Sequence, residues 1–234
     1  MSRAKRIGHK GAAHIAPGNT LASFDAALTQ GVDMIEFDVL PERLDGSGRL
    51  LLAHDYIDAS RRTPATLDEA LAHFAQPAFD GVELDVDMKL PGYEARVVDA
   101  LRAHGLAERA LISTMETESL PIVRELAPEI RLGRSFPRVR RDYTKHPVYR
   151  FPAYGLILYW RRRLPGVIGE QLRAGEFDAL MVHWAFVTPR LCGAVAEAGG
   201  EIYVWTVDVA TRIAELEALG VTGVITNDPR LFDP

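Results

Sequence analysis

The sequence has almost no cysteine and no long apolar run. Its 234 residues include one cysteine, Cys192. No disulfide can therefore form within the chain, which is typical of a reducing compartment. No apolar stretch approaches the about 20 residues that a membrane-spanning helix needs. The N-terminus is basic, but residues 7–11 do not form the apolar segment of a signal peptide. We therefore expect a cytoplasmic protein.

The chain also lacks an excess of positive charge. It carries 27 Lys and Arg residues against 32 Asp and Glu residues, a formal net charge of −5. Binding of nucleic acid usually requires a basic face, so no nucleic-acid partner is expected. Two basic clusters, at residues 138–141 and 159–163, are interpreted as surface turns, and membrane association is not expected. The oligomeric state is left open.

Short apolar runs alternate with segments of helical periodicity along the chain. Such alternation indicates a parallel sheet, and eight repeats favour a (β/α)8 (TIM) barrel over an open sheet. Thr66 with Glu69 has the pattern of a helix-capping box, and Gly105 follows an expected helix end. Strands are expected at residues 6–9, 33–39, 81–88, 110–114, 130–134, 178–184, 202–207 and 222–226. Helices are expected at residues 21–30, 67–74, 93–104, 118–126, 189–198 and 211–219.

No linker or low-complexity stretch divides the chain, so residues 1–234 are expected to form a single barrel domain. Two segments interrupt the alternation. Residues 40–62 contain a glycine-containing turn followed by an apolar run, which predicts a short hairpin inserted after the second strand. Residues 135–170 contain several prolines and two basic runs, and are expected to be irregular.

Polar residues end the predicted strands. In a (β/α)8 barrel the functional groups lie at the C-terminal ends of the strands, so these residues are expected to form a polar ring at that face. They are His9, Asp38, Asp87, Thr114, Arg134, His183, Thr206 and Thr226 or Asn227.

The densest group of candidate functional residues lies near the N-terminus. Side chains two residues apart in a strand share one face, so Glu36 and Asp38 are expected to point together. Their hard oxygens favour Mg²⁺ or Ca²⁺. The side chains of His9 and His54 have a usual pKa near neutrality and suit proton transfer. Asp55 is expected to orient His54 or to cap the insertion. The pattern predicts a hydrolytic site that holds a metal ion.

The predicted third strand alternates acidic and apolar residues. Glu83, Asp85, Asp87 and Lys89 would share one face. A solvated edge strand could show this pattern, but inside a barrel the acids need partners or a cation. Asp87 lies nearest the C-terminal end and is the expected third metal ligand, with Asp85 as the alternative and Glu83 deepest. Lys89 would neutralise a bound anion.

Five motifs follow one another in an order that resembles the glycerophosphodiester phosphodiesterase family, part of the phospholipase C-like phosphodiesterase superfamily. That family carries His-Arg-Gly, Pro-Glu-Asn-Thr, Glu-x-Asp after strand two, His-Asp after a hairpin, and Glu-x-Lys on strand three. The corresponding stretches here are His-Lys-Gly at 9–11, Pro-Gly-Asn-Thr at 17–20, Glu-Phe-Asp at 36–38, His-Asp at 54–55 and Asp-Met-Lys at 87–89. Residues 204–208 and 220–229 resemble the family's last two strands.

The resemblance implies a (β/α)8 barrel with a hairpin after strand two. It implies one divalent cation, Mg²⁺ or Ca²⁺, held by Glu36, Asp38 and Asp87, with His9 and His54 as the general acid and base. The implied reaction is hydrolysis of a glycerophosphodiester to glycerol 3-phosphate and an alcohol. Both water and a neighbouring hydroxyl of the substrate are compatible as the attacking group.

Three residues depart from the family pattern. Lys10 replaces an arginine and keeps its charge without the bidentate fork, while Gly18 replaces a glutamate, so the two changes roughly preserve the charge balance. Asp87 replaces a glutamate and is one methylene shorter. Lys10 and Lys89 are still expected to bind the phosphate. Trp205, at the predicted barrel mouth, would either cover an apolar part of the ligand or pack in the wall.

Other functions stay open. A lysophospholipase D-type phosphodiesterase would use the same residues on a lipid substrate. A catalytically weak barrel that binds a phosphorylated ligand is motivated by Lys10 and Gly18. A metal-independent lipase of the phospholipase C type is disfavoured, because it would not need three clustered acids.

Overall fold

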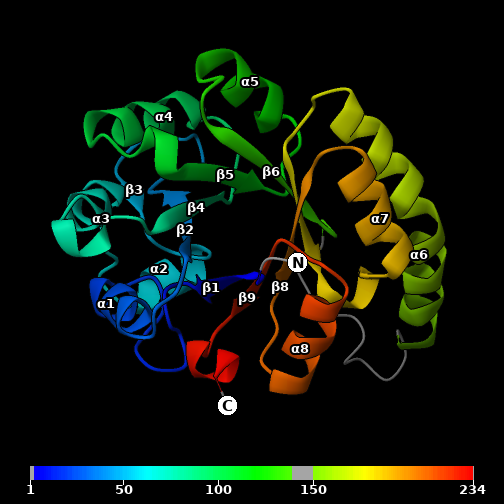
Figure 1. The fold of residues 1–234 in the computed structure, drawn as a ribbon. Coiled ribbons are helices and arrows are strands. Elements are labelled where there is room, and N and C mark those ends of the chain that lie inside the picture. The colour runs from blue at the N-terminus through cyan, green and yellow to red at the C-terminus, as the bar shows by residue number, and fades with distance from the viewer. Residues whose placement is uncertain (1–2, 139–149, 234) are drawn as a thin grey trace.

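The computed structural model describes residues 3–138 and 150–233. Its main feature is a closed ring of parallel strands surrounded by helices (Figure 1). The ring closes because β1 pairs in parallel with both β2 and β9. The prediction of a (β/α)8 barrel is therefore confirmed. Its parallel strands are β1 (Lys5–His9), β2 (Met34–Pro41), β4 (Glu83–Met88), β5 (Ala110–Thr114), β6 (Arg131–Phe136), β7 (Ala179–His183), β8 (Glu201–Trp205) and β9 (Gly223–Thr226).

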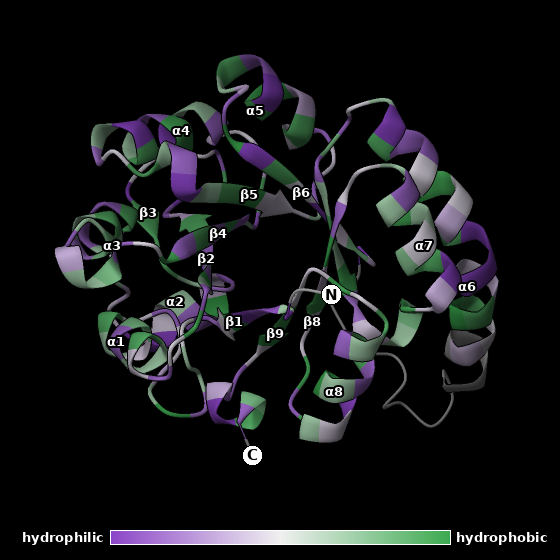
Figure 2. Ribbon diagram, viewed as in Figure 1, coloured by the Kyte–Doolittle hydropathy of each residue, from purple (hydrophilic) through white to green (hydrophobic). Residues whose placement is uncertain are grey.

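Helices cover the outside of the ring, and their starts follow local capping chemistry. Thr20 and Thr66 each accept a hydrogen bond from the third backbone N–H of the helix that follows, completing capping boxes. Figure 2 shows hydrophilic and hydrophobic residues on the same helix, for example on α4 and α7. The helices are α1 (Leu21–Thr29), α2 (Tyr56–Arg61), α3 (Leu67–Phe74), α4 (Glu94–Ala103), α5 (Ser119–Leu126), α6 (Arg150–Arg173), α7 (Pro189–Glu197) and α8 (Ala210–Ala218). Short 3-10 turns lie at Pro77–Phe79, Ala107–Arg109, Trp184–Phe186 and Pro229–Phe232.

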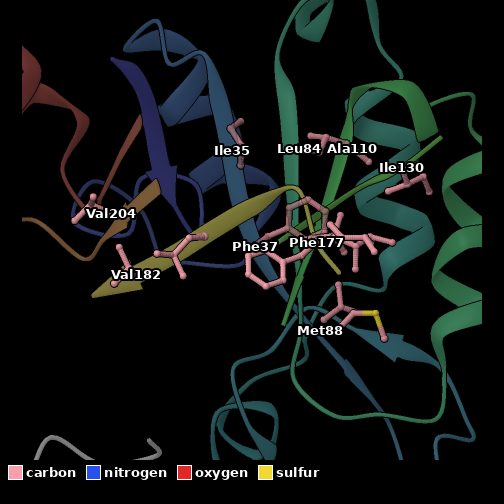
Figure 3. Close-up of a cluster of buried hydrophobic side chains, with 14 of the residues drawn as sticks. Ile35, Phe37, Leu84, Met88, Ala110, Ile130, Phe177, Val182 and Val204 are labelled. Carbon is pink, nitrogen blue, oxygen red and sulfur yellow. The ribbon is translucent and has the colours of Figure 1, made fainter. Parts of the chain in front are cut away.

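The alternation of side chains along each strand produces two apolar layers. The larger lies between strands and helices and includes Ile35 and Phe37 of β2 (Figure 3). The smaller fills the barrel interior around Met34 and Tyr203. Because Met34 faces inward, Glu36 and Asp38 also face inward, while the residues between them pack against the helices. The sequence pattern of β2 thus decides which side chains reach the interior.

A charged layer closes the N-terminal end of the barrel. The Nζ atom of Lys5 lies 2.5 Å from Oε1 of Glu83, and the guanidinium of Arg131 contacts the other carboxylate oxygen of Glu83. Arg131 also lies 3.1 Å from Oε2 of Glu201, to which Tyr203 donates a hydrogen bond of 3.2 Å. Glu83 is therefore the acid of β4 farthest from the C-terminal end, but it is more exposed than Asp85 and Asp87, and cations neutralise it.

The insertion after the second strand is a hairpin followed by a short helix. The end of β2 pairs in antiparallel fashion with β3 (Leu50–Leu51), which confirms the predicted hairpin. Helix α2 was not predicted, because its six residues include none that is buried and so show no apolar stripe. Asp55 caps this helix by accepting a hydrogen bond of 2.8 Å from the backbone N–H of Asp58.

The expectation of irregular structure at residues 135–170 is wrong where the structure describes this segment. Strand β6 continues to Phe136, and α6 occupies Arg150–Arg173 despite Pro165 within it. Leu164, Ile168 and Leu172 form a buried stripe at helical spacing, and this burial offsets the helix-breaking tendency of the proline.

The basic run at residues 161–163 lies on the exposed surface of α6 instead of in a turn. Of the other basic cluster, residues 139–141 lie outside the described residues. No helix within the two described ranges is long and apolar enough to cross a membrane.

Candidate active site

Three inward-facing carboxylates converge at the C-terminal end of the barrel. Glu36 and Asp38 on β2 and Asp87 on β4 each offer an oxygen, and these oxygens lie within 4.8 Å of one another. The strand register places Asp38 directly opposite Asp87. Asp85 lies outside this group. The structure thus brings together the three acids expected from the sequence and leaves the alternative ligand apart from them.

The donor set fits a hard divalent cation. Oδ1 of Asp87 is buried and accepts no hydrogen bond from any described residue, and Oδ1 of Asp38 has an ion pair with Lys89 as its partner. Buried carboxylate oxygens without donors are costly unless a cation approaches them. Oxygen-only ligands are the kind that Mg²⁺ and Ca²⁺ prefer.

Two lysines neutralise part of this charge. The ammonium of Lys89 forms ion pairs with Asp38 and Asp87, and Nζ of Lys10 lies 3.1 Å from Oδ2 of Asp38. Burial disfavours the charge on Lys89, but the carboxylates of Asp38 and Asp87 hold its pKa well above its usual value. Burial likewise opposes ionisation of Asp38, yet Lys89 and Lys10 hold the pKa of that carboxyl well below its usual range. Both predicted phosphate-binding lysines therefore contact the acid cluster.

The remaining acids are harder to ionise. Burial raises the pKa of Glu36 well above its usual value, and the charge of Asp38 adds to this effect. Burial also raises the pKa of Asp87, although Lys89 opposes it. For Asp85, burial and the neighbouring Asp87 raise the pKa to about 7. Since a cation favours ionised carboxylates, its binding would reverse these shifts in its own ligands.

Asn19 anchors the central acid and was not identified as a site residue from the sequence. It is 1% exposed, donates a hydrogen bond of 2.8 Å to Oδ2 of Asp38 and accepts one of 3.0 Å from the backbone N–H of Asp38. Its own N–H donates to the carbonyl of Lys10. Asn19 and Lys10 both have positive φ, of 58° and 53°. The sequence signal that could have identified Asn19 is its place directly before the helix cap Thr20, because asparagine tolerates a positive φ better than most residues.

Gly18 and Lys10, two of the three residues that depart from the family pattern, lie next to each other. A Cβ atom at Gly18 would lie 3.0 Å from Cβ of Lys10 and 3.2 Å from Cβ of Ala13. A side chain at position 18 would therefore press on the stem of Lys10. Glycine leaves room for that stem to cross the loop and reach Asp38.

His9 ends β1 beside the acid cluster. Its Nε2 atom lies 3.8 Å from Oε2 of Glu36, and its Nδ1 atom lies 2.6 Å from Oδ1 of Asn227. Burial, reinforced by the nearby charge of Lys10, lowers the pKa of His9 to about 4. The imidazole is therefore neutral at pH 7 and able to accept a proton.

His54 approaches the cluster from the insertion and is much more exposed than His9, at 54% against 22% for the side chains. Its Nδ1 atom lies 3.4 Å from Oδ2 of Asp55, the residue that caps α2. Asp55 therefore both caps the insertion and contacts His54, as expected. The charge of His54 contributes to lowering the pKa of Asp38, which places it within electrostatic range of the acids.

Arg134 and Thr114 of the expected polar ring face outward instead, as does Thr226, which shares its strand face with Val224 of the outer apolar layer. Arg134 contacts Gln171 of α6, and its guanidinium lies 5.9 Å from the ring centre of Phe177. Thr114 is fully buried and donates a hydrogen bond of 2.8 Å to the carbonyl of Met88. All three occupy positions of the strand period that point to the helices, so their inclusion in the ring was wrong.

Aromatic side chains line another part of the same face. Trp205 ends β8 and His183 ends β7, and their rings meet edge to face with centres 5.2 Å apart. Trp205 also packs against the inner apolar layer. It lies at the barrel mouth, and its contact with a substrate stays a prediction.

The chain matches the model of the glycerophosphoryl diester phosphodiesterase family over residues 9–70 and 60–231. A glycerophosphodiester phosphodiesterase of Caldanaerobacter subterraneus subsp. tengcongensis is 25% identical over 95% of this chain and 93% of its own length. A second, from Bacillus altitudinis, is 22% identical over 96% of this chain and 95% of its own.

Solved structures of similar proteins share the fold. A glycerophosphodiester phosphodiesterase from Parabacteroides distasonis superposes with a TM-score of 0.73 at 18% identity, covering 97% of this chain and 94% of its own. An Oleispira antarctica phosphodiesterase, solved in complex with its product sn-glycerol-3-phosphate, superposes with a TM-score of 0.70 at 21% identity. The aligned region covers 99% of this chain and 98% of that one.

Proposed function

The chain belongs to the glycerophosphoryl diester phosphodiesterase family, and from this premise we propose that it hydrolyses its substrate with one divalent cation and two histidines. It is a phosphoric diester hydrolase with glycerophosphodiester phosphodiesterase activity. The observation that carries the proposal is the convergence of three carboxylate oxygens within 4.8 Å, one of which, Oε2 of Glu36, lies 3.8 Å from Nε2 of His9. Hydrolysis would yield glycerol 3-phosphate and an alcohol.

Glu36, Asp38 and Asp87 would hold the cation, Mg²⁺ or Ca²⁺. When bound, it would stabilise negative charge that develops on the phosphoryl oxygens. The three carboxylates outnumber the two contacting lysines by one charge. A divalent cation therefore makes the cluster net positive, which complements a phosphodiester with a single negative charge.

The lysines would bind the phosphoryl group. Lys89 and Lys10 now neutralise the carboxylates that the cation would share, so their ammonium groups would become available to the substrate when the cation binds. Both side chains are part-exposed at the site face. Trp205 would lie against the substrate at the mouth of the barrel.

The two histidines would move the protons. His9 is neutral at pH 7 and would take the proton of the attacking hydroxyl, while His54 would protonate the leaving alkoxide. His54 is the more exposed of the two, so it can recover a proton from solvent. General acid–base groups of this kind contribute roughly 10²–10⁴-fold each.

A lysophospholipid is the second candidate substrate, and the first half of α6 favours it. Trp160 of this helix contacts Phe136, the last residue of β6, so this part of the helix lies near the site face of the barrel. Leu156 and Leu158 beside it are more than half exposed. Exposed apolar side chains at this position would suit an acyl chain.

A substrate panel tests the proposal. Purified protein is assayed for release of glycerol 3-phosphate from water-soluble glycerophosphodiesters and for release of lysophosphatidate from long-chain lysophospholipids. Chelator should abolish the release, and Mg²⁺ or Ca²⁺ should restore it. Full activity in chelator would contradict the role of the acids. Binding of glycerol 3-phosphate without turnover under either metal would instead indicate a catalytically weak barrel.

A further inference from the structure

His9 is linked to two residues at the opposite end of the chain. Its Nδ1 atom lies 2.6 Å from Oδ1 of Asn227, which follows β9. Nδ2 of Asn227 donates a hydrogen bond of 2.7 Å to Oδ2 of Asp208, and its backbone N–H donates one of 2.8 Å to Oδ1 of the same carboxylate. The three side chains thus form a chain of hydrogen bonds that leads from the loop after β8 to the active site.

Asp208 determines which way the Asn227 amide points. A carboxylate can only accept hydrogen bonds, so the amide must turn its NH₂ group toward Asp208. Its carbonyl oxygen then faces His9 and can likewise only accept. The Nδ1 atom of His9 must therefore carry a proton, and in the neutral ring the lone pair lies on Nε2. Nε2 is the atom that faces Glu36, at 3.8 Å.

The surroundings hold this arrangement in place. Asp208 accepts a further hydrogen bond of 3.1 Å from the hydroxyl of Thr226, which is fully buried. The backbone carbonyl of Asn227 accepts one of 3.0 Å from the backbone N–H of His14, which lies in the loop after β1. The carboxylate of Asp208 and the backbone of Asn227 are therefore each held by groups outside the acid cluster.

We propose that Asn227 and Asp208 are positioning residues that keep Nδ1 of His9 protonated and present the bare Nε2 to the reaction centre. This inference rests on the proposed function and deepens it, because it names the two residues that direct Nε2 of His9 to the reacting atoms in the roles proposed above. His9 is the proton acceptor, and His54 is the proton donor.

The proton transfers balance in this assignment. The proton of the attacking O–H moves to Nε2 of His9 as the new bond from oxygen to phosphorus forms. The bond between phosphorus and the alcohol oxygen breaks, and His54 gives that oxygen its proton. The imidazolium of His9 then carries protons on both nitrogens, and Nδ1 keeps its hydrogen bond to Asn227.

The substitution Asp208→Asn tests the inference directly. It places a donor opposite the NH₂ group of Asn227, so that amide is expected to flip and point its NH₂ at His9. Nδ1 would then have to accept, and the proton would move to Nε2. The ¹⁵N NMR signals of the His9 ring should show this inversion of the tautomer. We expect kcat to fall roughly 10²–10⁴-fold, the usual contribution of a general base, with KM little changed.

A reciprocal exchange separates positioning from a merely structural role. Asn227→Asp alone sets two carboxylates against each other and should be inactive. In the double variant Asn227→Asp/Asp208→Asn, the new amide donates to the new carboxylate, which still accepts from Nδ1 of His9. The double variant should therefore keep the wild-type tautomer and recover kcat to within about tenfold. Asp68→Asn, which removes a carboxylate from the surface residue His104, is the matched control and should change neither kcat nor the His9 signals.

Three results would overturn the inference: a wild-type His9 with a bare Nδ1, an Asp208→Asn variant with wild-type kcat, or a folded double variant as inactive as Asn227→Asp. The double variant preserves every contact, so it tests the idea even where a single variant fails to fold. The NMR measurement needs no substrate. Absence of phosphodiesterase activity in the wild type would therefore contradict the proposed function, while the tautomer would still test the positioning role.

Discussion

The two ends of the barrel interior both carry charge, but they differ in how it is paired. At the N-terminal end, Glu83 lies between Lys5 and Arg131; although burial opposes ionisation, these cations hold its pKa below its usual value. At the C-terminal end, burial raises the pKa values of Asp85 and Asp87, while Lys89 and Lys10 hold the pKa of Asp38 well below its usual range. The same strand, β4, supplies an acid to both ends.

Both ends contain acidic residues, and the functional end differs from the other in how completely its acids are paired with cations and hydrogen-bond donors. A satisfied ionic layer closes the bottom of the barrel, and its charges have no capacity left for a ligand. Among the residues that the structure describes, the upper layer keeps buried carboxylate oxygens without hydrogen-bond donors, and this is where we propose that a cation binds.

The largest expected effect is at the upper end. His9→Ala and His54→Ala should each lower kcat roughly 10²–10⁴-fold, because each removes one proton-transfer group. Thermal unfolding should change little, since neither side chain belongs to the ionic layer. Steady-state kinetics and melting curves check both statements, with the exposed His14→Ala as control. Full activity in either active-site variant would exclude the proposed acid–base pair.

The next effect concerns stability and pH. The folded pKa of Asp85, about 7, lies above its usual 3.8, so the folded protein holds this proton more tightly. The stabilisation that comes from this tighter binding of the proton is complete below pH 4 and is lost as the pH rises through 7. Asn cannot ionise and avoids this loss. The stability gain of Asp85→Asn over wild type should therefore grow by roughly 2–3 kcal/mol between pH 5 and pH 8.

Urea unfolding in chelator at the two pH values measures this difference, because chelator keeps cation binding out of the comparison. A gain that does not depend on pH would show that Asp85 ionises as readily as a surface acid. The upper end would then resemble the lower one.

A smaller effect is expected at the lower end. Glu83→Gln removes the shared partner of Lys5 and Arg131. The group is partly exposed, so the loss of stability should be about 1–3 kcal/mol, below the figure for a fully buried pair. Activity per folded molecule should stay at the wild-type level. Glu42→Gln, at an exposed pair with Arg49, should change the stability far less than Glu83→Gln does.

A reduced kcat in folded Glu83→Gln would contradict the division between a structural lower end and a functional upper end. The urea midpoint gives the stability of the variant, and steady-state kinetics on the same preparation give its activity.

The smallest effect is expected at Gly18. Gly18→Ala brings a methyl group within 3.0 Å of Cβ of Lys10, which should shift the lysine stem and raise KM a few-fold with kcat nearly constant. Gly92→Ala is a useful comparison for general loop strain, because its φ is 99° but a Cβ there would meet no atom of the described part of the chain within 4 Å. A similar KM change in both variants would argue against a specific effect on Lys10.

Much of the fold and of the acid cluster could be predicted because strand periodicity is local. Alternation in β2 and β4 assigns Glu36, Asp38 and Asp87 to one face whatever surrounds them. The same rule failed for Arg134 because it ends a predicted strand on the helix-facing side, and strand ends are the least certain positions. Helix α6 was not predicted because Pro165 is unfavourable within a helix. The apolar stripe that stabilises this helix does so only through its burial in the tertiary structure.

The sequence by itself determined the barrel, the hairpin and the faces of the acidic strands, since these depend on patterns within a few residues. Only the tertiary structure decided how those faces are paired. Asn227 meets His9 across 218 positions of sequence because closure of the ring sets β9 against β1. Lys5 meets Glu83, and Asn19 meets Asp38, for the same reason. The partner of a charged or hydrogen-bonding group is a property of the closed barrel, and local periodicity carries no information about it.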